Sequence, residues 1–503
     1  MRDAARRALW IAIATVALAG PATADDRFAP APQPRPAGPA SGAEERPSEQ
    51  DLFGAPPAAA AGPPAPRAET ALSEFLSRTD NPLTIGGQLY LRSMLAARDG
   101  QPPSAWQLTA PSLLDVFLDA RPSDRVRGFV LGRMFYDPTI DPNATGPLGR
   151  PPPTNPQVVL DQLWLRFDAE KVAFFTVGKQ HVKWGTGRFW NPTDYLHAVR
   201  RDPLAVFDAR TGTTMVRVQV PWERLGWSFE TMAILEPLTP SADTGALDPT
   251  AARGAAASQA GTVGGVGGAA RAQIVLGPSE LGLGAVLQRG HDPRFAVDAS
   301  VGVSELDFYT EAALKTGTEV PVFRPRPGAT VATPLVQRYE PYAPDGLTPA
   351  ITAGVRWEHK YSDEDSFELG GEYFYNRAGY DDSAIYPWLL YQNALTPFYL
   401  GRQYAGVYLY LPNPGAWNHT TFILSTIGNL SDRSFVTRLD HSVLLLTYLR
   451  LETFAQVHYG ASGGEFRLAL DVPSQDLGGG AATPTVKLGA ATFDVGVAVR
   501  VSL

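Results

Sequence analysis

Residues 177–194 read VGKQHVKWGTGRFWNPTD, and they join two kinds of sequence. A strand-like run at 172–183 leads directly into a segment rich in glycine, aromatic and charged residues. The segment continues to Gly212, and the next strand-like run, 213–220, follows it. A long charged loop with many aromatic residues between two amphipathic strands is unusual in a water-soluble β-sandwich. It is typical of a membrane barrel in which an external loop folds back over the barrel's own mouth.

Apolar and polar residues alternate with a period of two on both sides of this stretch. In the run 214–220, valines at every second position alternate with Met215, Arg217 and Gln219. Strict alternation predicts strands with one apolar and one polar face. The same pattern occurs at 89–95, 295–301, 351–358 and 367–373, whereas 172–183 and 435–449 leave the facing of the side chains open.

The connections between these runs form two groups. Tight turns are expected at 121–124, 168–171, 221–224, 277–280, 361–364 and 412–415, and long connections at 137–157, 184–212, 237–266, 316–348 and 378–401. When the strands are counted from the first, every long connection falls on one side and every tight turn on the other. Bacterial outer-membrane barrels have this asymmetry. We therefore predict an all-β fold, a single antiparallel transmembrane β-barrel of about 18 strands, in the range of roughly 16–18.

The composition agrees with a barrel and excludes several other classes. Beyond the N-terminus, no run of the 503-residue chain reaches the roughly 18 consecutive apolar residues of a membrane-spanning helix. The net charge of −8 argues against a nucleic-acid partner, which favours a basic surface. The chain has no cysteine, so a disulfide, a thiolate metal site and a cysteine nucleophile are excluded.

Three segments are expected before the barrel. Residues 1–24 are predicted to be a secretory signal peptide, because a basic start is followed by an apolar core and small residues; the alternative is a membrane anchor. Residues 25–70 are rich in proline and alanine and are predicted to be a disordered tether, either a simple spacer or an arm that reaches a periplasmic partner. A short lead-in, 71–82, precedes the barrel at 83–503.

The last residues of the chain form another alternating run. Phe493, Val495, Val497, Val499 and Val501 lie on one face, and the run ends at Leu503. This pattern resembles the closing strand and assembly signal of outer-membrane proteins, although those usually end in Phe or Trp.

The segment around 178–221 also resembles a known family. The matching motifs are Gly178-Lys179-Gln180, Trp184-Gly185, Asn191-Pro192-Thr193-Asp194, Asp202-Pro203-Leu204, Arg210-Thr211-Gly212 and Val220-Pro221. Together they look like a segment of porin-like outer-membrane β-barrels of Gram-negative bacteria. The resemblance implies a channel or an export pore and does not identify a substrate.

Two sets of residues are candidates for the lining of the pore. Candidates for the constriction are Lys183, Trp184, Arg188, Asp194, Arg200, Arg201, Asp202, Asp208 and Arg210, with the arginines expected to face the aspartates. Candidates for the wall are Arg217, Arg294, Arg356, Glu358, Glu368 and Glu372, with Asp298, Glu305, Asp307 and Glu311 also expected to face inward. An inward charged residue is expected to meet water in a lumen. The mixed signs predict no clean anion or cation preference. The alternative role of the loop is a structural plug.

No enzyme activity, cofactor or metal is expected. Asp440, His441 and Ser442 are neighbours in sequence, and neighbouring strand residues point to opposite faces. The seven histidines lack the spacing of a metal site. The glycine-rich stretch 261–268 is not followed by the Lys-Ser/Thr of a phosphate-binding loop.

The leading functional prediction is passive passage of hydrophilic solutes across the cell outer membrane. The alternatives are an exopolysaccharide export pore working with periplasmic secretion machinery and a non-conducting scaffold or surface-binding barrel. Expected partners are outer-membrane lipid, a hydrophilic solute or polysaccharide, and the barrel-assembly machinery, with no nucleic acid. The sequence leaves open whether the chain forms a homo-oligomer.

Overall fold

The computed structural model describes residues 83–143, 154–235, 266–473 and 486–503, apart from the single positions 198, 207, 209, 289, 290, 319, 320 and 364. The expected signal peptide, tether and lead-in lie outside the described residues, as does most of the expected connection 237–266. Within the described residues, no helix has the length and apolar character needed to cross a membrane.

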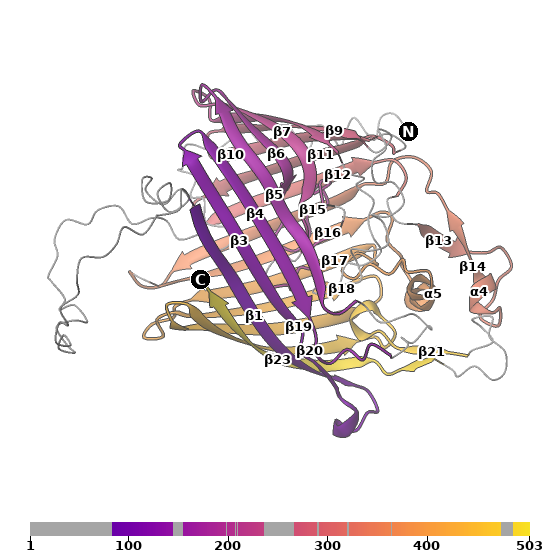
Figure 1. Ribbon diagram of the computed structural model, residues 1–503. Coiled ribbons are helices and arrows are strands. Elements are labelled where there is room, and N and C mark those ends of the chain that lie inside the picture. Colours follow the sequence, from indigo (N-terminus) through magenta and orange to yellow (C-terminus); the bar gives the residue numbers. More distant parts are fainter. Residues whose placement is uncertain are drawn as a thin grey trace, which may run out of the picture. The chain divides into compact units, whose positions relative to one another are not determined.

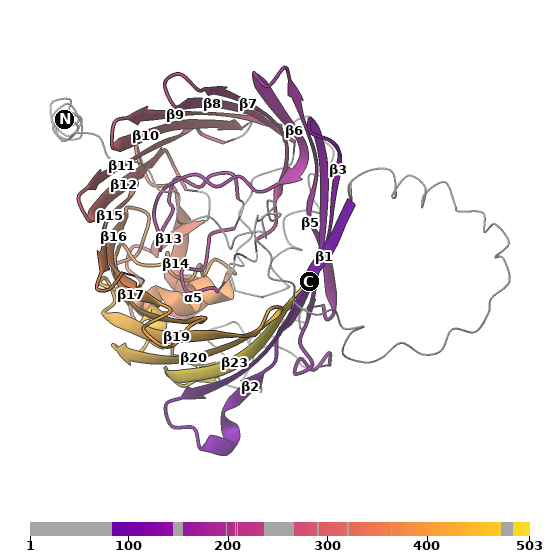
Figure 2. The same cartoon turned by 90° about the vertical axis from the view of Figure 1, so that its left-hand side faces the viewer.

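Eighteen antiparallel strands pair in sequence order and close into a barrel, as the alternation predicts (Figures 1 and 2). The strands are β1 (Leu83–Arg98), β3 (Ser112–Ser123), β4 (Val126–Tyr136), β5 (Gln157–Ala169), β6 (Ala173–Gln180), β7 (Thr213–Trp222), β8 (Trp227–Ile234), β9 (Gly267–Leu276), β10 (Ser279–Gln288), β11 (Arg294–Val303), β12 (Leu306–Lys315), β15 (Ala350–Lys360), β16 (Ser366–Asn376), β17 (Gln403–Pro412), β18 (Thr420–Asn429), β19 (Ser434–Leu446), β20 (Leu449–Gly460) and β23 (Ala491–Ser502).

The barrel closes through strand β23, which pairs with both β20 and β1. Leu91 of β1 lies opposite Val499 of β23 on one side and Ser112 of β3 on the other. At the end of this seam, Leu503 and Gly87 exchange both backbone hydrogen bonds, at 2.9 and 3.2 Å. Closure leaves the main sheet without an unpaired edge.

The apolar face of the strands points outward and the polar face points into the ring. Val297 and Leu369 expose 36% and 44% of their surface, whereas the intervening polar residues Asp298 and Glu372 expose 2% and 4%. A soluble protein has the opposite arrangement, with the apolar face covered. A closed barrel with an apolar exterior satisfies its backbone hydrogen bonds internally and matches lipid on the outside. The protein is therefore a Gram-negative outer-membrane protein.

The strand connections differ at the two ends of the barrel. One end carries only turns of a few residues, such as 277–278 between β9 and β10 and 304–305 between β11 and β12. The other end carries all the long connections that the sequence predicts, together with two further long ones, 99–111 and 461–490, that the sequence pattern did not reveal. Two connections at that end, 289–293 and 430–433, are short.

The long connections contain the remaining regular elements. These are η1 (Pro103–Ala105), β2 (Gln107–Thr109), β13 (Val322–Pro325), α4 (Leu335–Arg338), β14 (Tyr339–Tyr342), η3 (Ser383–Ile385), α5 (Tyr386–Tyr391), η4 (Glu465–Arg467), β21 (Leu470–Val472) and β22 (Val486–Leu488). Strand β2 extends the pairing of β1, whereas β13 with β14 and β21 with β22 form separate two-stranded sheets. A core that includes Phe323, Leu335, Trp388 and Leu400 joins the connections 316–349 and 377–402.

Two predicted strand boundaries are wrong. The run 172–183 is strand only as far as Gln180, because the chain then turns into the barrel. The run 435–449 is strand β19 followed by the start of β20, with a two-residue turn at 447–448. Both runs were the ones whose facing the sequence left open.

A matched pair of substitutions on β11 tests the two faces. Val297→Arg places a charge on the outer face near the middle of the strand, and we expect it to lower the free energy of unfolding in lipid by about 2–4 kcal/mol. Ser300→Arg places the same side chain on the inner face of the same strand, where we expect a change smaller than about 1 kcal/mol. Urea unfolding in vesicles measures both values. Equal losses for the two variants contradict this assignment of the faces.

Candidate functional site

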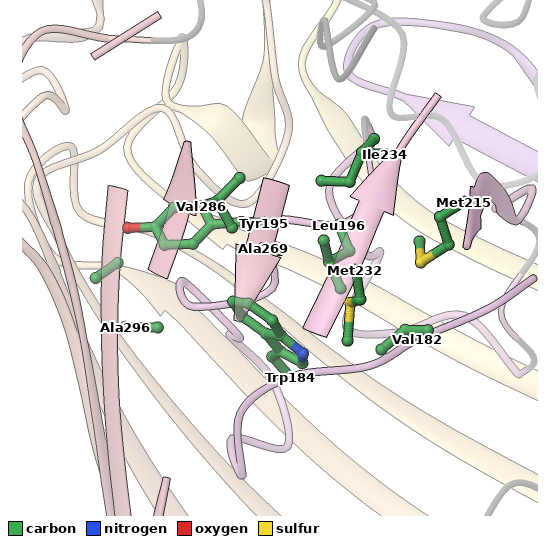
Figure 3. Packing of buried hydrophobic residues seen from close by; sticks show 11 residues of the cluster. Val182, Trp184, Tyr195, Leu196, Met215, Met232, Ile234, Ala269, Val286 and Ala296 are labelled. Atoms are coloured by element: carbon green, nitrogen blue, oxygen red, sulfur yellow. The ribbon is translucent and has the colours of Figure 1, made fainter. Parts of the chain in front are cut away.

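The connection between β6 and β7, residues 181–212, lies inside the ring of strands, and we name it the inner loop (Figure 2). Its first part packs against the inner faces of several strands. Trp184, Tyr195 and Leu196 form a buried cluster with side chains from β7 to β12, among them Met215 and Val286 (Figure 3). Trp184 is 1% exposed. The inner face of this part of the barrel is therefore covered by the loop.

The next part of the inner loop packs against strands further around the ring. Phe189 and Trp190 join a cluster with Phe374 of β16 and with Tyr404 and Tyr408 of β17. The rings of Trp190 and Phe374 stack with their centroids 5.6 Å apart and their planes at 13°. The indole Nε1 of Trp190 donates to the backbone carbonyl of Phe398 at 3.0 Å. These aromatic contacts hold the loop against the wall.

Two buried carboxylates of the wall bind the backbone of the inner loop. Glu372 of β16 accepts the backbone N–H groups of Arg188 at 2.8 Å, of Phe189 at 3.1 Å and of Trp190 at 2.7 Å. It also accepts the hydroxyl of Tyr309 at 2.9 Å. A carboxylate surrounded by donors in this way is satisfied without water.

Glu311 of β12 has the same role one turn of the loop earlier. It accepts the backbone N–H of Gly187 at 2.8 Å and both the backbone N–H and the hydroxyl of Thr193, at 3.3 and 2.5 Å. A Cβ at Gly187 would lie 2.1 Å from the carbonyl oxygen of Trp190 and 2.6 Å from Glu311 Oε1. Glycine at this position lets the backbone approach the carboxylate.

The strongest ion pairs of the inner loop lie within the loop. The guanidinium group of Arg210 contacts Asp194 at 3.0 Å and Asp208 at 2.6 Å. Burial alone would raise the pKa of the Asp194 carboxyl, but interactions with His197 and Arg210 outweigh it and lower the pKa to about 2. Arg210 also lowers the pKa of Asp208 against the effect of burial. Four arginines were expected to face aspartates. Arg210 is one of them, and it pairs with two aspartates, Asp194 and Asp208.

The other constriction candidates make different contacts. Arg188 lies over the ring of Tyr408 at 3.8 Å, and its backbone carbonyl accepts Arg201 Nη1 at 3.1 Å. Arg200 donates to the carbonyl of Pro192 and lies 5.8 Å from the ring of Tyr399. Lys183 is exposed within the ring.

Asp202 brings the inner loop close to charges of the wall. Burial raises the pKa of its carboxyl, and the charges of Arg438, Arg201 and Arg92 act in the opposite direction. Arg92 belongs to β1 and Arg438 to β19. Asp202 is therefore a constriction candidate whose charge interacts with charges of the wall.

The wall candidates form local pairs rather than a row of free charges. Arg217 pairs with Glu230, Arg356 pairs with Asp307, and Arg294 donates to Gln288 at 3.0 Å. The carboxylate of Glu368 accepts the hydroxyl of Tyr408. Glu358 is half-buried on β15.

Four of the residues expected to face water in a lumen are located differently. Glu311 and Glu372 are covered by the inner loop, and Asp298 is buried in contact with Arg271 at 2.8 Å. Glu305 lies in the turn between β11 and β12, where it is exposed and accepts from Trp357 and His359. Periodicity predicted the face of the first three residues correctly but not what covers that face.

Sequence reasoning missed the charged recess beside the end of the inner loop. The recess is lined by residues that include Tyr90, Val206, Arg438, Asp440, Glu452 and Phe454. Arg92 and Arg438 lie over the ring of Phe454 at 4.7 and 4.2 Å. Arg438 pairs with Asp440, and Arg500 pairs with Glu452. The open facing of 435–449 concealed this part of the wall.

A chain of hydrogen bonds through two histidines was also missed. His181 Nε2 lies 2.8 Å from Asp161 Oδ1, His181 Nδ1 lies 3.1 Å from His197 Nε2, and His197 Nδ1 lies 3.0 Å from the carboxylate of Asp194. The two histidines are 16 residues apart, a spacing without a recognisable motif. Among the described residues, no group of three or more His, Cys, Asp or Glu side chains is arranged to hold a metal ion.

Comparisons with known proteins find similarity in structure alone. No family model matches the chain, and no curated protein matches it. Pseudomonas putida OprB is 9% identical, over 86% of this chain and 96% of that chain, with a TM-score of 0.47. Acinetobacter baumannii OccAB4 is 8% identical, over 84% and 98%, with a TM-score of 0.48. A triple mutant of Rhodopseudomonas blastica porin is 8% identical, over 84% and 100%, with a TM-score of 0.38. The assignment of the fold rests on the strand pairing described above.

The carboxylate of Glu372 provides the first test of how the loop is held. Glu372→Ala leaves three backbone N–H groups without their acceptor, and we expect a loss of stability of about 3 kcal/mol. We also expect faster hydrogen exchange at residues 188–190, measured by mass spectrometry of the detergent-solubilised barrel. The control is Glu340→Ala, which removes an exposed ion pair worth about 0–1 kcal/mol. Unchanged exchange at 188–190 contradicts the role assigned to Glu372.

The packing of Phe189 against Gly406 provides a second, independent test. A Cβ at Gly406 of β17 would lie 2.6 Å from the Phe189 ring, so Gly406→Ala displaces the ring, and we expect it to cost about 1–3 kcal/mol. The control is Gly371→Ala on β16, where the nearest atom to an added Cβ is 3.9 Å away. Urea unfolding and protease cleavage within the inner loop measure both effects. Equal behaviour of the two variants shows that Phe189 is not seated on Gly406.

Proposed function

We propose that this protein is a porin-like outer-membrane channel for the passive passage of hydrophilic solutes. The supporting observation is the course of the inner loop. Its parts lie against the wall at several places around the ring. Trp184, Tyr195 and Leu196 lie in the cluster of β7 to β12, Phe189 and Trp190 pack on β16 and β17, and Val206 lies beside β18, β19 and β20. A loop that follows the wall narrows a barrel without crossing it.

The charges of the narrowed region suit polar solutes of either sign. Arg92 and Arg438 of the wall act on the charge of Asp202 in the inner loop. Asp440 and Glu452 line the recess that also contains Arg438. Low-dielectric walls focus the fields of such groups in a narrow space. We infer that Arg201, Asp202, Arg92 and Arg438 form the constriction and that Arg188, Asp194 and Arg210 hold the loop in place.

Conductance separates this function from a non-conducting scaffold. Purified barrel inserted into a planar bilayer is expected to give stable ion-conducting channels. Silent insertion, established by heat-modifiability of the same sample, favours the scaffold. Block of the current by long polysaccharide chains, but not by small sugars, favours an export pore.

Removal of the inner loop tests its position in the channel. Excision of 186–208, with a short Gly/Ser linker across the gap, is expected to raise single-channel conductance because the narrow region is lost. The control is excision of 327–333 between β13 and α4, elements that lie beyond the end of the barrel (Figure 1), which is expected to leave conductance close to that of the parent protein. An assembled barrel without the inner loop but with parental conductance and ion selectivity shows that the loop lies outside the conduction path.

A further inference from the structure

The histidine pair joins the wall of the barrel to the inner loop. His181 directly follows β6 and bonds through Nε2 to Asp161 of β5. His197 lies on the inner loop and bonds through Nδ1 to Asp194, which Arg210 holds from the other side. The two rings meet at 3.1 Å, between His181 Nδ1 and His197 Nε2.

Counting donors fixes the protonation of this chain. Asp161 accepts the backbone N–H of Gly212 and faces Arg133, so its carboxylate acts as an acceptor and His181 Nε2 must carry a proton. Asp194 accepts from Arg210, so His197 Nδ1 must carry a proton as well. A hydrogen bond between the two remaining nitrogens needs one further proton. The pair therefore holds three protons on four ring nitrogens, which is one positive charge.

Charged groups of both signs surround the histidine pair. Four carboxylates face the pair directly or through its immediate partners: Asp115, Asp161, Asp194 and Asp208. Three cations accompany them: Arg133 beside Asp115 and Asp161, Arg210 beside Asp194 and Asp208, and Lys183, whose charge acts together with that of Asp194. With one extra proton on the histidine pair, the charges of these groups sum to zero.

We propose that His181 and His197 form a proton-operated clasp that fastens the inner loop to the barrel wall when the pair carries one, and only one, shared proton. With a second extra proton, two N–H groups face each other. With none, two lone pairs face each other. Either change breaks the contact between the rings, while each ring keeps its own aspartate.

The geometry also indicates which part of the loop the clasp controls. Asp194, His197, Arg210 and Asp208 are bonded to one another and move as a unit of the loop. Residues 187–193 remain fixed by Glu311 and Glu372, which the histidines do not touch. Opening the clasp therefore removes one of the contacts that hold the second half of the loop, which includes Asp202 and Val206, and we expect this half to loosen. Other contacts remain: Arg200 and Arg201 donate to the backbone carbonyls of Pro192 and Arg188, and Thr213 donates to the carbonyl of Leu196. The clasp acts on how the loop is held and does not depend on which solute passes.

A fluorescent label on the second half of the loop shows whether the clasp is closed. This measurement does not depend on channel conductance. The chain has no cysteine, so Val206→Cys, at a position 46% exposed, takes a single environment-sensitive fluorophore. Fluorescence is followed in micelles with a chelator present, from about pH 4 to about pH 9, which brackets the ordinary histidine pKa of about 6.5. We expect the fastened form to predominate at intermediate pH. On the acid side, the ratio of released to fastened loop should rise about tenfold per pH unit, since release takes up one proton.

Matched variants show whether the histidines cause this response. We call the release of the loop at acid pH the acid limb. In the labelled protein, His197→Gln is expected to abolish it. His291→Gln, an exposed histidine in the connection between β10 and β11, is expected to leave it unchanged. Nitrogen-15 NMR of histidine-labelled barrel without substitutions gives a second measurement. It should detect one N–H···N hydrogen bond between imidazoles that disappears as the pH falls.

Three outcomes overturn the proposal. The acid limb persists in His197→Gln; the NMR signal of the shared hydrogen bond is absent at every pH; or the loop is fastened only when Zn²⁺ replaces the chelator. The last outcome would mean that the two nitrogens hold a metal ion, each ring being oriented by an aspartate as metal-binding histidines commonly are.

Discussion

The three backbone N–H groups that converge on the carboxylate of Glu372 are the interaction on which the interior of this barrel depends. A carboxylate buried without partners is strongly unfavourable, and so are backbone N–H groups buried without acceptors. The backbone N–H groups of residues 188–190 supply donors to the Glu372 carboxylate, and the carboxylate supplies their acceptor. Because the carboxylate belongs to β16 and the amides to a loop between β6 and β7, the contact fixes the loop to the far part of the ring and brings Phe189 and Trp190 onto their aromatic partners.

The barrel thus has an interior of two kinds. Where the inner loop lies on the wall, the space is dry and packed, with Trp184 and Trp190 buried among strand residues. Where Val206 of the loop lies beside β18, β19 and β20, Arg438, Asp440 and Glu452 line a recess, with Arg92 over the ring of Phe454 close by. The first region has the packing of a protein core, and the second has the mixed charges of a polar passage.

The sequence predicted the barrel well because alternation and loop length are local signals. The period-two runs at 214–220 and 295–301 became β7 and β11 with their apolar faces outward, and the unequal connections identified the two ends. The candidate site was predicted only in part. The inward facing of Glu311 and Glu372 follows from periodicity, but the loop that covers them is more than 100 residues earlier in the chain. The approach of His181 to His197 depends on the folded path of the loop, and no spacing in the sequence encodes it.

The separation in sequence between the inner loop and its carboxylate anchors constrains the order of assembly. Gly187 can bond Glu311 only after a further 124 residues of the chain are in place, and Arg188 can bond Glu372 only after a further 184. Until β12 and β16 are in place, the amides of the loop are bonded to water and its aromatic side chains lack the strand residues against which they pack. Contacts between residues so far apart form late, because closing a long chain segment costs entropy before the contact stabilises it. The inner loop must also already be inside when β23 pairs with β1, so the barrel closes around a loop that was held there by its later strands.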